Sequence, residues 1–311
     1  VQHEGSETAD GLTVGEFWEQ WFEPRLKPPA YSPSTVAGYR DVYRVHISPA
    51  FGRRVMERIK PYEVQEWIDS MSYGSARHAK ALLSVMYSTA CNDFQLIDRN
   101  IMLKRYRLPR KARRVLDVNE AVFTREEAER VLEECRGEFW EPAFILSCFG
   151  GCRRGEAAAC RTEDITAVEG ERGTYAIYNV ARAIQYIGGE LVIGMKNDSS
   201  IGAAVIPPPY ASRLLEIAGA CDGWLMDDGM GNPVNPNAMT VAWRRWFADR
   251  PIPGIPWKNL RNTYVTLMHE AGYDIETISK LCRHTTAQVT SRNYDRPTPA
   301  MLVRILDSGR G

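Results

Sequence analysis

The sequence has no apolar run that approaches the roughly 20 residues a membrane-spanning helix needs. Its N-terminus, VQHEGSETADG, lacks the basic and then apolar layout of a secretory signal peptide. It also lacks a C-x-x-C pair, a P-loop and any paired Cys/His cluster with zinc-site spacing. Together with the composition, these features argue against membrane, collagen-like, disordered and disulfide-scaffold classes, and they offer no zinc site. The seven cysteines, an odd number, predict reduced and buried thiols in a reducing compartment.

The composition is that of an ordinary soluble globular protein, with 44% hydrophobic and 25% charged residues. A length of 311 residues suggests two domains. The net charge of zero hides an asymmetry, because residues 1–116 hold 18 Lys/Arg against 13 Asp/Glu, whereas residues 117–311 hold 21 against 26. Seven basic residues and no acid lie between Lys104 and Arg114. This stretch is either a solvated linker or a strap along a phosphate backbone, and we weigh the two interpretations equally.

Apolar spacings of three and four residues predict a helical first domain. Helix starts are expected at Thr13, with Glu16 completing a capping box, and at Ser32. The predicted organisation is a disordered N-terminus over 1–12, a helical domain over 13–103, a basic linker over 104–116, a second domain over 117–298 and a C-terminal tail over 299–311.

The second domain is predicted to mix helices with a small antiparallel sheet, so the fold class is mainly α. A helix capped by Thr124 opens it, and one long apolar helix is expected over 142–160. Strand-like runs at 174–184, 189–195 and 203–209 predict an antiparallel hairpin or meander, and from Tyr210 the chain returns to helices.

Four separated segments carry side chains suited to an anionic substrate. They are residues 151–156 (GCRRGE), 195–200 (MKNDSS), 257–263 (WKNLRNT) and 281–284 (LCRH), with Tyr294 ten positions after His284. Each side chain alone also has an ordinary structural interpretation, as a surface ion pair of Arg153 with Glu156, a solvated turn residue (Lys196), a helix salt bridge (Arg261), a core histidine (His284) or one of 14 mostly packing tyrosines (Tyr294). Their order and spacing together favour one shared site.

Together these segments resemble the boxes of the tyrosine recombinase, or phage integrase, family. The G-L-R-R-G-E box is similar to residues 151–156, the H-x-L-R-H-T box to 258–263, the A-G-x-D-x-x-x-I helix to 271–278 and the G-H-S-S element to 283–286. The resemblance implies an all-helical core-binding (SAM-like) domain followed by an α+β catalytic domain. By position it implies six catalytic residues: Arg153, Lys196, Lys258, Arg261, His284 and the nucleophile Tyr294.

Three departures from the family pattern stand out. Lys258 occupies the usual histidine position, as in type IB topoisomerases, and Arg283 occupies a usual glycine position. A lysine still donates to a phosphate oxygen, but it is a poor general base unless its pKa is lowered. The sequence begins almost at the core-binding domain, so we expect either a compact integrase or a chain from which an arm-site-binding domain has been removed.

The implied reaction cuts and rejoins DNA without a metal or any other cofactor. Tyr294 would attack a phosphodiester, form a 3′-phosphotyrosine and release a 5′-hydroxyl, and exchange would proceed through a Holliday junction. Arg153 and Arg261 would each offer paired N–H groups to the non-bridging oxygens, and Lys196 would protonate the leaving oxygen. The implied biological role is site-specific DNA recombination, including integration of a viral genome.

The implied partners are double-stranded DNA with core-type attachment sites and further copies of the chain, in a homotetramer on two DNA sites. An accessory or directionality factor is a further candidate partner, no membrane is expected, and the expected location is the cytoplasm of a bacterial host, with the nucleoid. The residues expected to contact DNA, with solvated surface as the alternative, are Arg77, Lys80, Lys104, Arg105, Arg107, Arg110, Lys111, Arg113 and Arg114.

Two other functions stay open at this point. Lys258 suits a type IB topoisomerase-like relaxing enzyme, whereas the close spacing of His284 and Tyr294 favours a recombinase. A catalytically inactive DNA-binding regulator is disfavoured because five expected catalytic residues are retained: Arg153, Lys196, Arg261, His284 and Tyr294. The apolar tail residues after Tyr294 are expected either to dock on a neighbouring protomer or to fold back in cis.

Overall fold

The computed structural model describes residues 11–110, 122–194, 201–283, 303 and 306–307. The chain divides into two compact units, Val1–Val115 and Leu116–Gly311, called here the helical unit and the C-terminal unit. The described residues are mainly helical, with small antiparallel sheets in the C-terminal unit, so the predicted fold class is confirmed. Within the described ranges, no helix is long and apolar enough to cross a membrane.

The helices of the helical unit begin where the sequence predicts caps. Thr13 Oγ1 accepts the N–H of Glu16 at 3.1 Å, and Ser32 Oγ accepts the N–H of Thr35 at 3.2 Å. The α-helices are α1 (Val14–Phe17), α2 (Pro33–Val42), α3 (Ser48–Phe51), α4 (Pro61–Asp69) and α5 (Tyr73–Ser88). Short π or 3-10 turns cover Trp18–Phe22, Glu23–Arg25, Tyr43–Ile47, Met56–Arg58, Thr89–Asp93 and Ile101–Leu103.

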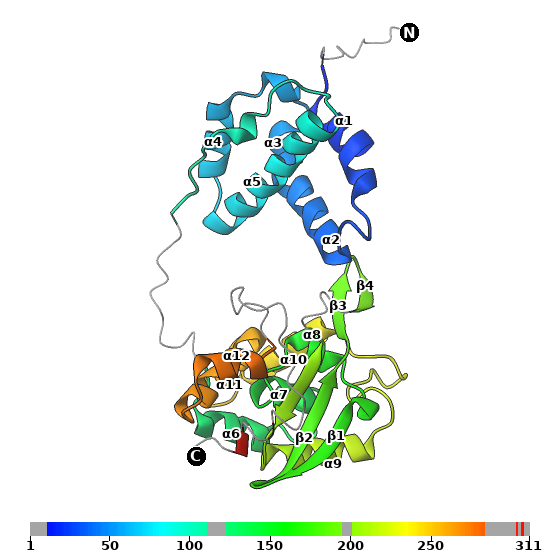
Figure 1. The fold of residues 1–311 in the computed structure, drawn as a ribbon, viewed down its shortest axis with the longest axis vertical. Coiled ribbons are helices and arrows are strands. Elements are labelled where there is room, and N and C mark those ends of the chain that lie inside the picture. The colour runs from blue at the N-terminus through cyan, green and yellow to red at the C-terminus, as the bar shows by residue number, and fades with distance from the viewer. Residues whose placement is uncertain (1–10, 111–121, 195–200, 284–302, 304–305, 308–311) are drawn as a thin grey trace. The chain divides into compact units, whose positions relative to one another are not determined.

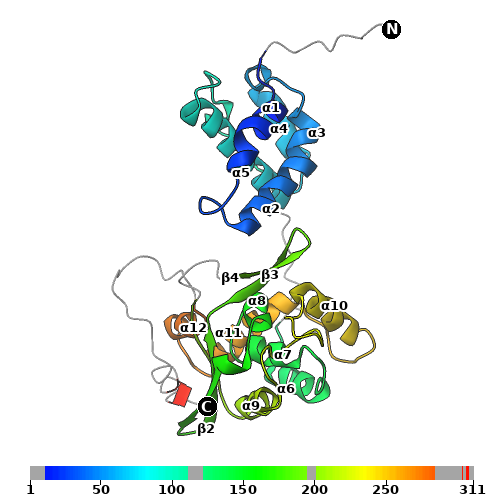
Figure 2. The same cartoon turned by 90° about the vertical axis from the view of Figure 1, so that its right-hand side faces the viewer.

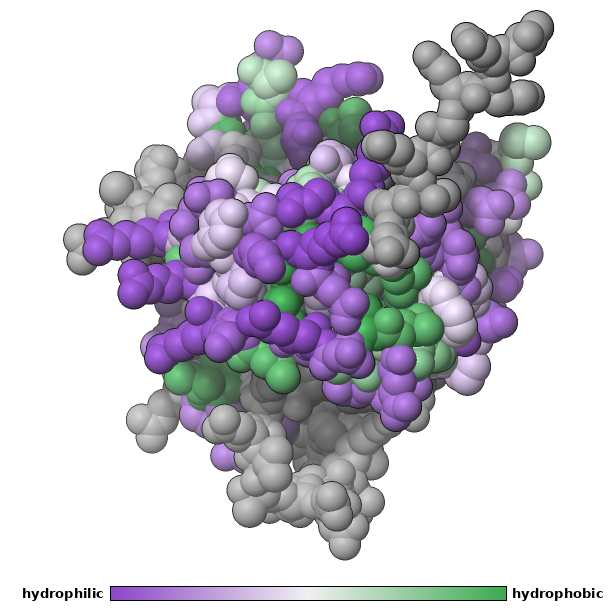
Figure 3. All heavy atoms as spheres, turned by 90° about the horizontal axis from the view of Figure 1, so that it is seen from above, coloured by the Kyte–Doolittle hydropathy of each residue, from purple (hydrophilic) through white to green (hydrophobic). Residues whose placement is uncertain are grey.

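An aromatic-rich core holds the helical unit together. Trp18 stacks on Tyr43 with ring centroids 3.9 Å apart, and the buried Tyr87 hydroxyl donates to Met56 O at 2.9 Å. Tyr106 and Leu108 also pack against this core, although the sequence analysis assigned them to the linker. In the view of Figure 3, hydrophilic residues cover most of the visible face, as expected where apolar side chains gather in cores.

The C-terminal unit is built around a three-stranded antiparallel sheet of order β1-β2-β5, and a separate hairpin β3-β4 projects from it (Figures 1 and 2). The strands are β1 (Ile165–Gly170), β2 (Gly173–Val180), β3 (Ala183–Ile187), β4 (Glu190–Gly194) and β5 (Gly202–Ile206). The register places Ala176 of β2 opposite Ala167 of β1 and Ile206 of β5. The run predicted as one strand over 174–184 is therefore two strands in different sheets.

Both faces of the sheet are covered by helices. Tyr175 and Ile177 lie in one core with residues of α11 and α12, whereas Tyr178 and Val180 lie in another with residues of α7 and α9. Because β2 is buried on both sides, it appears in the sequence as a continuous apolar run. The helices are α6 (Arg125–Glu134), α7 (Glu141–Cys148), α8 (Arg154–Ala158), α9 (Tyr210–Ala220), α10 (Pro236–Trp246), α11 (Leu260–Glu270) and α12 (Ile275–Leu281), with 3-10 turns at Thr162–Asp164 and Trp257–Asn259.

The end of the chain packs on this sheet within the same molecule. Val303 and Leu306 belong to the core that contains Tyr175, and Tyr175 donates its hydroxyl to Asp307 Oδ1 at 2.6 Å. Tyr273 donates to Leu306 O at 2.7 Å. These contacts correspond to the cis alternative of the sequence analysis.

The prediction of one long helix over 142–160 is wrong, because the helix is interrupted between α7 and α8. Gly151 has a φ of +63°, a backbone conformation that ends a right-handed helix and favours glycine. Tyr264 packs directly against it, so that a Cβ on Gly151 would lie 2.7 Å from Tyr264 Cδ1. The break gives the chain a new helix start, with Arg153 in the N-cap position of α8.

We expect Gly151→Ala to lower the free energy of unfolding by about 2–4 kcal/mol, since it combines backbone strain with overpacking. Gly137→Ala is the matched control, because Gly137 also has a positive φ of +85° but a Cβ there would meet open space. It should cost only about 1–2 kcal/mol. Urea denaturation measures both values, and equal losses would contradict the role of the Tyr264 contact.

Candidate active site

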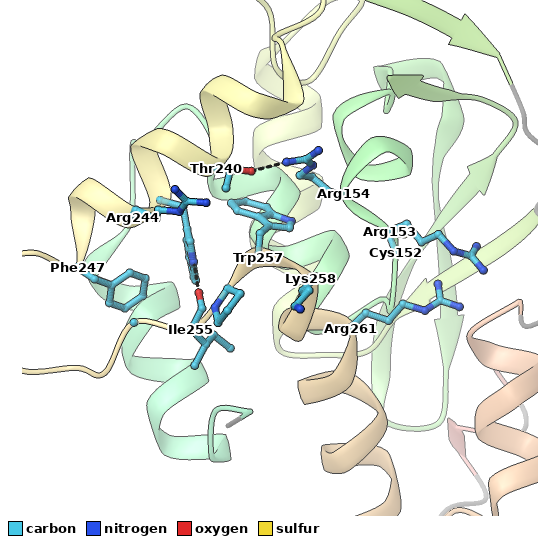
Figure 4. Close-up of a pocket in the computed structure, with 13 residues that line it drawn as sticks. Cys152, Arg153, Arg154, Thr240, Arg244, Phe247, Ile255, Trp257, Lys258 and Arg261 are labelled. Atoms are coloured by element: carbon cyan, nitrogen blue, oxygen red, sulfur yellow. Dashed lines mark hydrogen bonds between the residues drawn. The ribbon is translucent and has the colours of Figure 1, made fainter. Parts of the chain in front are cut away.

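Three of the predicted catalytic residues line one cleft of the C-terminal unit. Arg153, Lys258 and Arg261 share a cleft of about 810 Å³ with Arg154 and Arg244, and no carboxylate is among its lining residues (Figure 4). Arg153 stands at the start of α8, Lys258 in the 3-10 turn before α11, and Arg261 in the first turn of α11. Elements about 100 residues apart in the sequence therefore build one electropositive cleft.

Glu156 fixes the position of Arg153. Its Oε2 accepts the backbone N–H of Arg153 at 2.9 Å, and its Oε1 accepts from Arg153 Nη1 at 2.6 Å. Burial acts to raise the pKa of Glu156, but the charge of Arg283 and the hydrogen bonds from Arg153 outweigh it, so this pKa lies below its usual value. Glu156 is thus a buried carboxylate that orients Arg153, while the Arg153 side chain stays 42% exposed.

Arg261 is held by backbone carbonyls from two other segments. Its Nη1 donates to Gly151 O at 2.6 Å, and its Nη2 donates to Cys282 O. Burial lowers the pKa of Arg261, and the nearby positive charges of Arg153 and Arg283 lower it further. No carboxylate within the described residues forms an ion pair with Arg261, so its direct hydrogen-bond partners are carbonyl oxygens, and Glu156 acts on its charge from a longer distance.

Buried aromatic residues anchor the turn that carries Lys258. Trp257 packs edge-on against Trp140 and Trp243, with ring centroids 6.2 Å and 5.1 Å apart. Trp243 Nε1 donates to Ile255 O at 2.6 Å, which fixes the approach to the turn. Because Trp257 points into the core, its neighbour Lys258 is exposed at the cleft (Figure 4).

Arg283 lies at the back of this site with an unusual backbone conformation. Its φ is +54°, and the residue is only 8% exposed. Its Nη2 donates to Glu156 Oε2 at 2.9 Å, so one carboxylate is shared by Arg153 and Arg283. Arg261 also interacts with the charge of Glu156, so three arginines share this one buried acid.

The cleft therefore favours binding of an anion to the two candidate arginines. Figure 4 shows the side chains of Arg153 and Arg261 extending in the same direction. Two fixed guanidinium groups that both retain free N–H groups suit the non-bridging oxygens of a phosphodiester. The cysteine in the cleft is no nucleophile, because burial raises the pKa of Cys152 to about 11.

The other predicted site residues fall in two groups. Lys196, His284 and Tyr294 lie outside the described residues, as do Lys111, Arg113 and Arg114. In the helical unit, Arg77 and Lys80 lie on α5, and Lys104, Arg105, Arg107 and Arg110 follow the last 3-10 turn. All six are exposed or half-buried, and no described carboxylate forms an ion pair with them.

The sequence analysis did not assign Arg154, Arg244 or Arg283 to the site. Arg154 Nη1 donates to Thr240 Oγ1 at 2.7 Å, which joins α8 to α10 beside the cleft. Arg244 lies on α10, far from any box in the sequence, and gave no local signal. At Arg283 the signal was an arginine at a position that is usually glycine, which the sequence analysis reported as a departure from the family pattern without assigning it a role.

Known proteins are similar to this chain in sequence and in fold. Residues 13–72 match a family described as "Phage integrase, N-terminal SAM-like domain". A protein described as tyrosine recombinase XerC-like, from Caldanaerobacter subterraneus subsp. tengcongensis, is 21% identical over 315 residues, which cover 93% of this chain and 80% of that protein. A putative prophage phiRv2 integrase of Mycobacterium tuberculosis is 26% identical over 322 residues, which cover 98% of this chain and 81% of that protein.

Solved structures share the fold. The Tn1549 transposon integrase in complex with a circular intermediate DNA has a TM-score of 0.69 at 14% identity, covering 96% of this chain and 99% of that chain. A lambda integrase tetramer bound to a Holliday junction has a TM-score of 0.65 at 12% identity, and the match covers 91% of this chain and 81% of that chain. The chain is therefore similar in sequence, over nearly its full length, to tyrosine recombinases (phage integrases), and it shares their fold.

Proposed function

We propose that the protein is a site-specific DNA recombinase of the integrase type, which cuts and rejoins DNA through a 3′-phosphotyrosine intermediate and a Holliday junction. The observation that carries this proposal is the pair Arg153 and Arg261, held rigidly in one electropositive cleft. A phosphodiester bound there would balance their charge. Preorganised donors of this kind stabilise the charge that develops on a phosphorane in the transition state.

The remaining chemistry is assigned from the sequence. Tyr294 is the proposed nucleophile, and Lys196 is the proposed acid that protonates the 5′-oxygen as it leaves. His284 and Lys258 would add hydrogen bonds to the phosphate oxygens. The phosphotyrosine bond conserves the energy of the broken phosphodiester, so a second 5′-hydroxyl attacks it and reseals the DNA.

The proposed assembly is a homotetramer on two double-stranded core-type sites. The lambda integrase relative is a tetramer on a Holliday junction, which supports this stoichiometry. The proposed place of action is the cytoplasm of a bacterial host, with the nucleoid, because the DNA substrate is there. An accessory or directionality factor is a further proposed partner.

The experiment that tests this function is trapping on a nicked suicide substrate that carries the attachment site. A recombinase should give a covalent adduct at the DNA 3′ end with a free 5′-hydroxyl, and a second site should yield exchanged strands. Relaxation of supercoiled DNA without exchange between sites would favour a type IB topoisomerase-like enzyme. Specific binding with no adduct would favour an inactive regulator.

The cleft also predicts which surface arginine contacts the DNA backbone. Arg244→Gln should weaken DNA binding and reduce the slope of log Kd against log salt by about 0.9, the value for one lost phosphate contact. The neighbouring Arg245 is also exposed but does not line the cleft, so Arg245→Gln is the matched control. Fluorescence anisotropy titrations over a range of salt concentrations measure both slopes. Identical slopes for the two variants would remove Arg244 from the interface.

A further inference from the structure

Arg283 has a backbone conformation in which any side chain raises the conformational energy. At a φ of +54°, glycine is unstrained, whereas a residue with a Cβ is disfavoured. Holding a buried arginine in this conformation destabilises the folded protein unless the contacts of its side chain offset the backbone strain and the loss of hydration. The contribution must therefore come from the contacts of the guanidinium group.

Those contacts centre on Glu156. Arg283 Nη2 lies 2.9 Å from Glu156 Oε2, while Arg153 Nη1 lies 2.6 Å from Glu156 Oε1. Arg283 Nη1 also donates to Ala203 O at 3.4 Å, and its Nη2 contacts Cys152 Sγ at 3.6 Å. The Arg283 side chain thus connects the end of α12 to β5 and to the segment that carries Arg153.

The charge balance gives this arrangement a consequence for catalysis. With Arg153 as its sole partner, Glu156 would cancel the charge of the arginine that it orients. With Arg283 as a second partner, the cluster of Arg153, Glu156 and Arg283 keeps a net charge of +1. The buried Arg283 is turned away from solvent, whereas the Arg153 side chain is 42% exposed, so the excess charge is available at the cleft.

We propose that Arg283 is a positioning residue that neutralises Glu156, so that Arg153 is held in place by the carboxylate and still presents a full positive charge to the DNA phosphate. This inference rests on the proposed function. It extends that function by assigning a role to a side chain that touches neither the substrate nor the reacting atoms.

The test compares single-turnover adduct formation on two suicide substrates, one with a normal scissile phosphate and one with a methylphosphonate there. The methylphosphonate replaces a charged oxygen by a methyl group, so its cleavage depends less on cationic charge. Arg283→Met should slow cleavage of the phosphate substrate by about tenfold or more. It should slow cleavage of the methylphosphonate substrate less. Because the ratio of the two rates is independent of the active fraction, partial misfolding cannot produce the shift.

Arg213→Met is the matched control. Arg213 pairs with the buried Glu141 at 2.6 Å, and neither residue lines the cleft, so this variant also leaves a buried glutamate without its arginine. Its ratio of phosphate to methylphosphonate rates should equal that of the unchanged protein. An unchanged ratio in Arg283→Met as well would overturn the proposal.

A second variant tests the charge balance directly. Adding Glu156→Gln to Arg283→Met removes the negative charge that Arg283 offsets but keeps an amide oxygen that accepts from Arg153, so the double variant should recover part of the lost cleavage rate on the phosphate substrate. Failure of this rescue would count against the proposal, because loss of packing alone is not repaired by a second change. If the unchanged protein forms no adduct on either substrate, the proposed function fails, which is a different result from a failed rescue.

Discussion

Tyr294→Phe is expected to abolish the covalent protein–DNA adduct, lowering the rate of its formation by at least about 10⁴-fold. Phenylalanine lacks the phenolic oxygen that forms the bond to phosphorus, and none of the described residues that line the cleft is a tyrosine that could replace it. Burial raises the pKa of both nearby thiols, Cys152 and Cys282, which keeps them protonated near neutral pH. DNA affinity should change by less than about twofold, because no charge is removed.

Gel analysis of the trapped adduct on a suicide substrate measures the loss, and a binding titration on the intact site measures the affinity. Tyr273→Phe serves as the control, since Tyr273 is a tyrosine of the same unit whose hydroxyl bonds Leu306 O at 2.7 Å. That variant should form the adduct at the normal rate. An adduct that persists in Tyr294→Phe would assign the nucleophile to another residue.

The candidate site was predictable where a short motif specifies both the residue and its local context. Arg153 and Arg261 were found in this way, and the structure brings them into one cleft although they are 108 positions apart in the sequence. The caps at Thr13, Ser32 and Thr124 were predictable for a similar reason, since each is a local hydrogen-bond pattern. Features of this kind can be predicted because they depend on residues only a few positions apart.

What the sequence did not predict depends on contacts between distant segments. The break at Gly151 was missed because apolar residues lie on both sides of it, and the contact of Gly151 with the distant Tyr264 has no signal in the local sequence. Strand β1 was missed because it is an edge strand in which no side chain is fully buried. The pairing of Arg283 with Glu156 was also not predicted, because the two residues are 127 positions apart in the sequence.

Arg261→Lys is expected to slow cleavage by about 10²–10³-fold while preserving most of the DNA affinity. The charge is kept, but a single ammonium group cannot replace the fork that donates to both Gly151 O and Cys282 O. Without this double tether, the start of α11 loses its fixed orientation toward the segment that holds Arg153. The transition state should therefore lose both a paired phosphate donor and the alignment of the donors that remain.

Arg250→Lys is the matched control for this change. Arg250 also donates from Nη1 to a backbone carbonyl, Trp246 O, at 2.5 Å, but it lies outside the cleft. Single-turnover adduct rates at saturating protein separate cleavage from binding, and Arg250→Lys should keep the normal rate. If Arg261→Lys cleaved within about threefold of the unchanged protein, the charge of residue 261 would suffice without its geometry. The rigid arginine pair, the observation on which the proposed function stands, would then have no catalytic meaning.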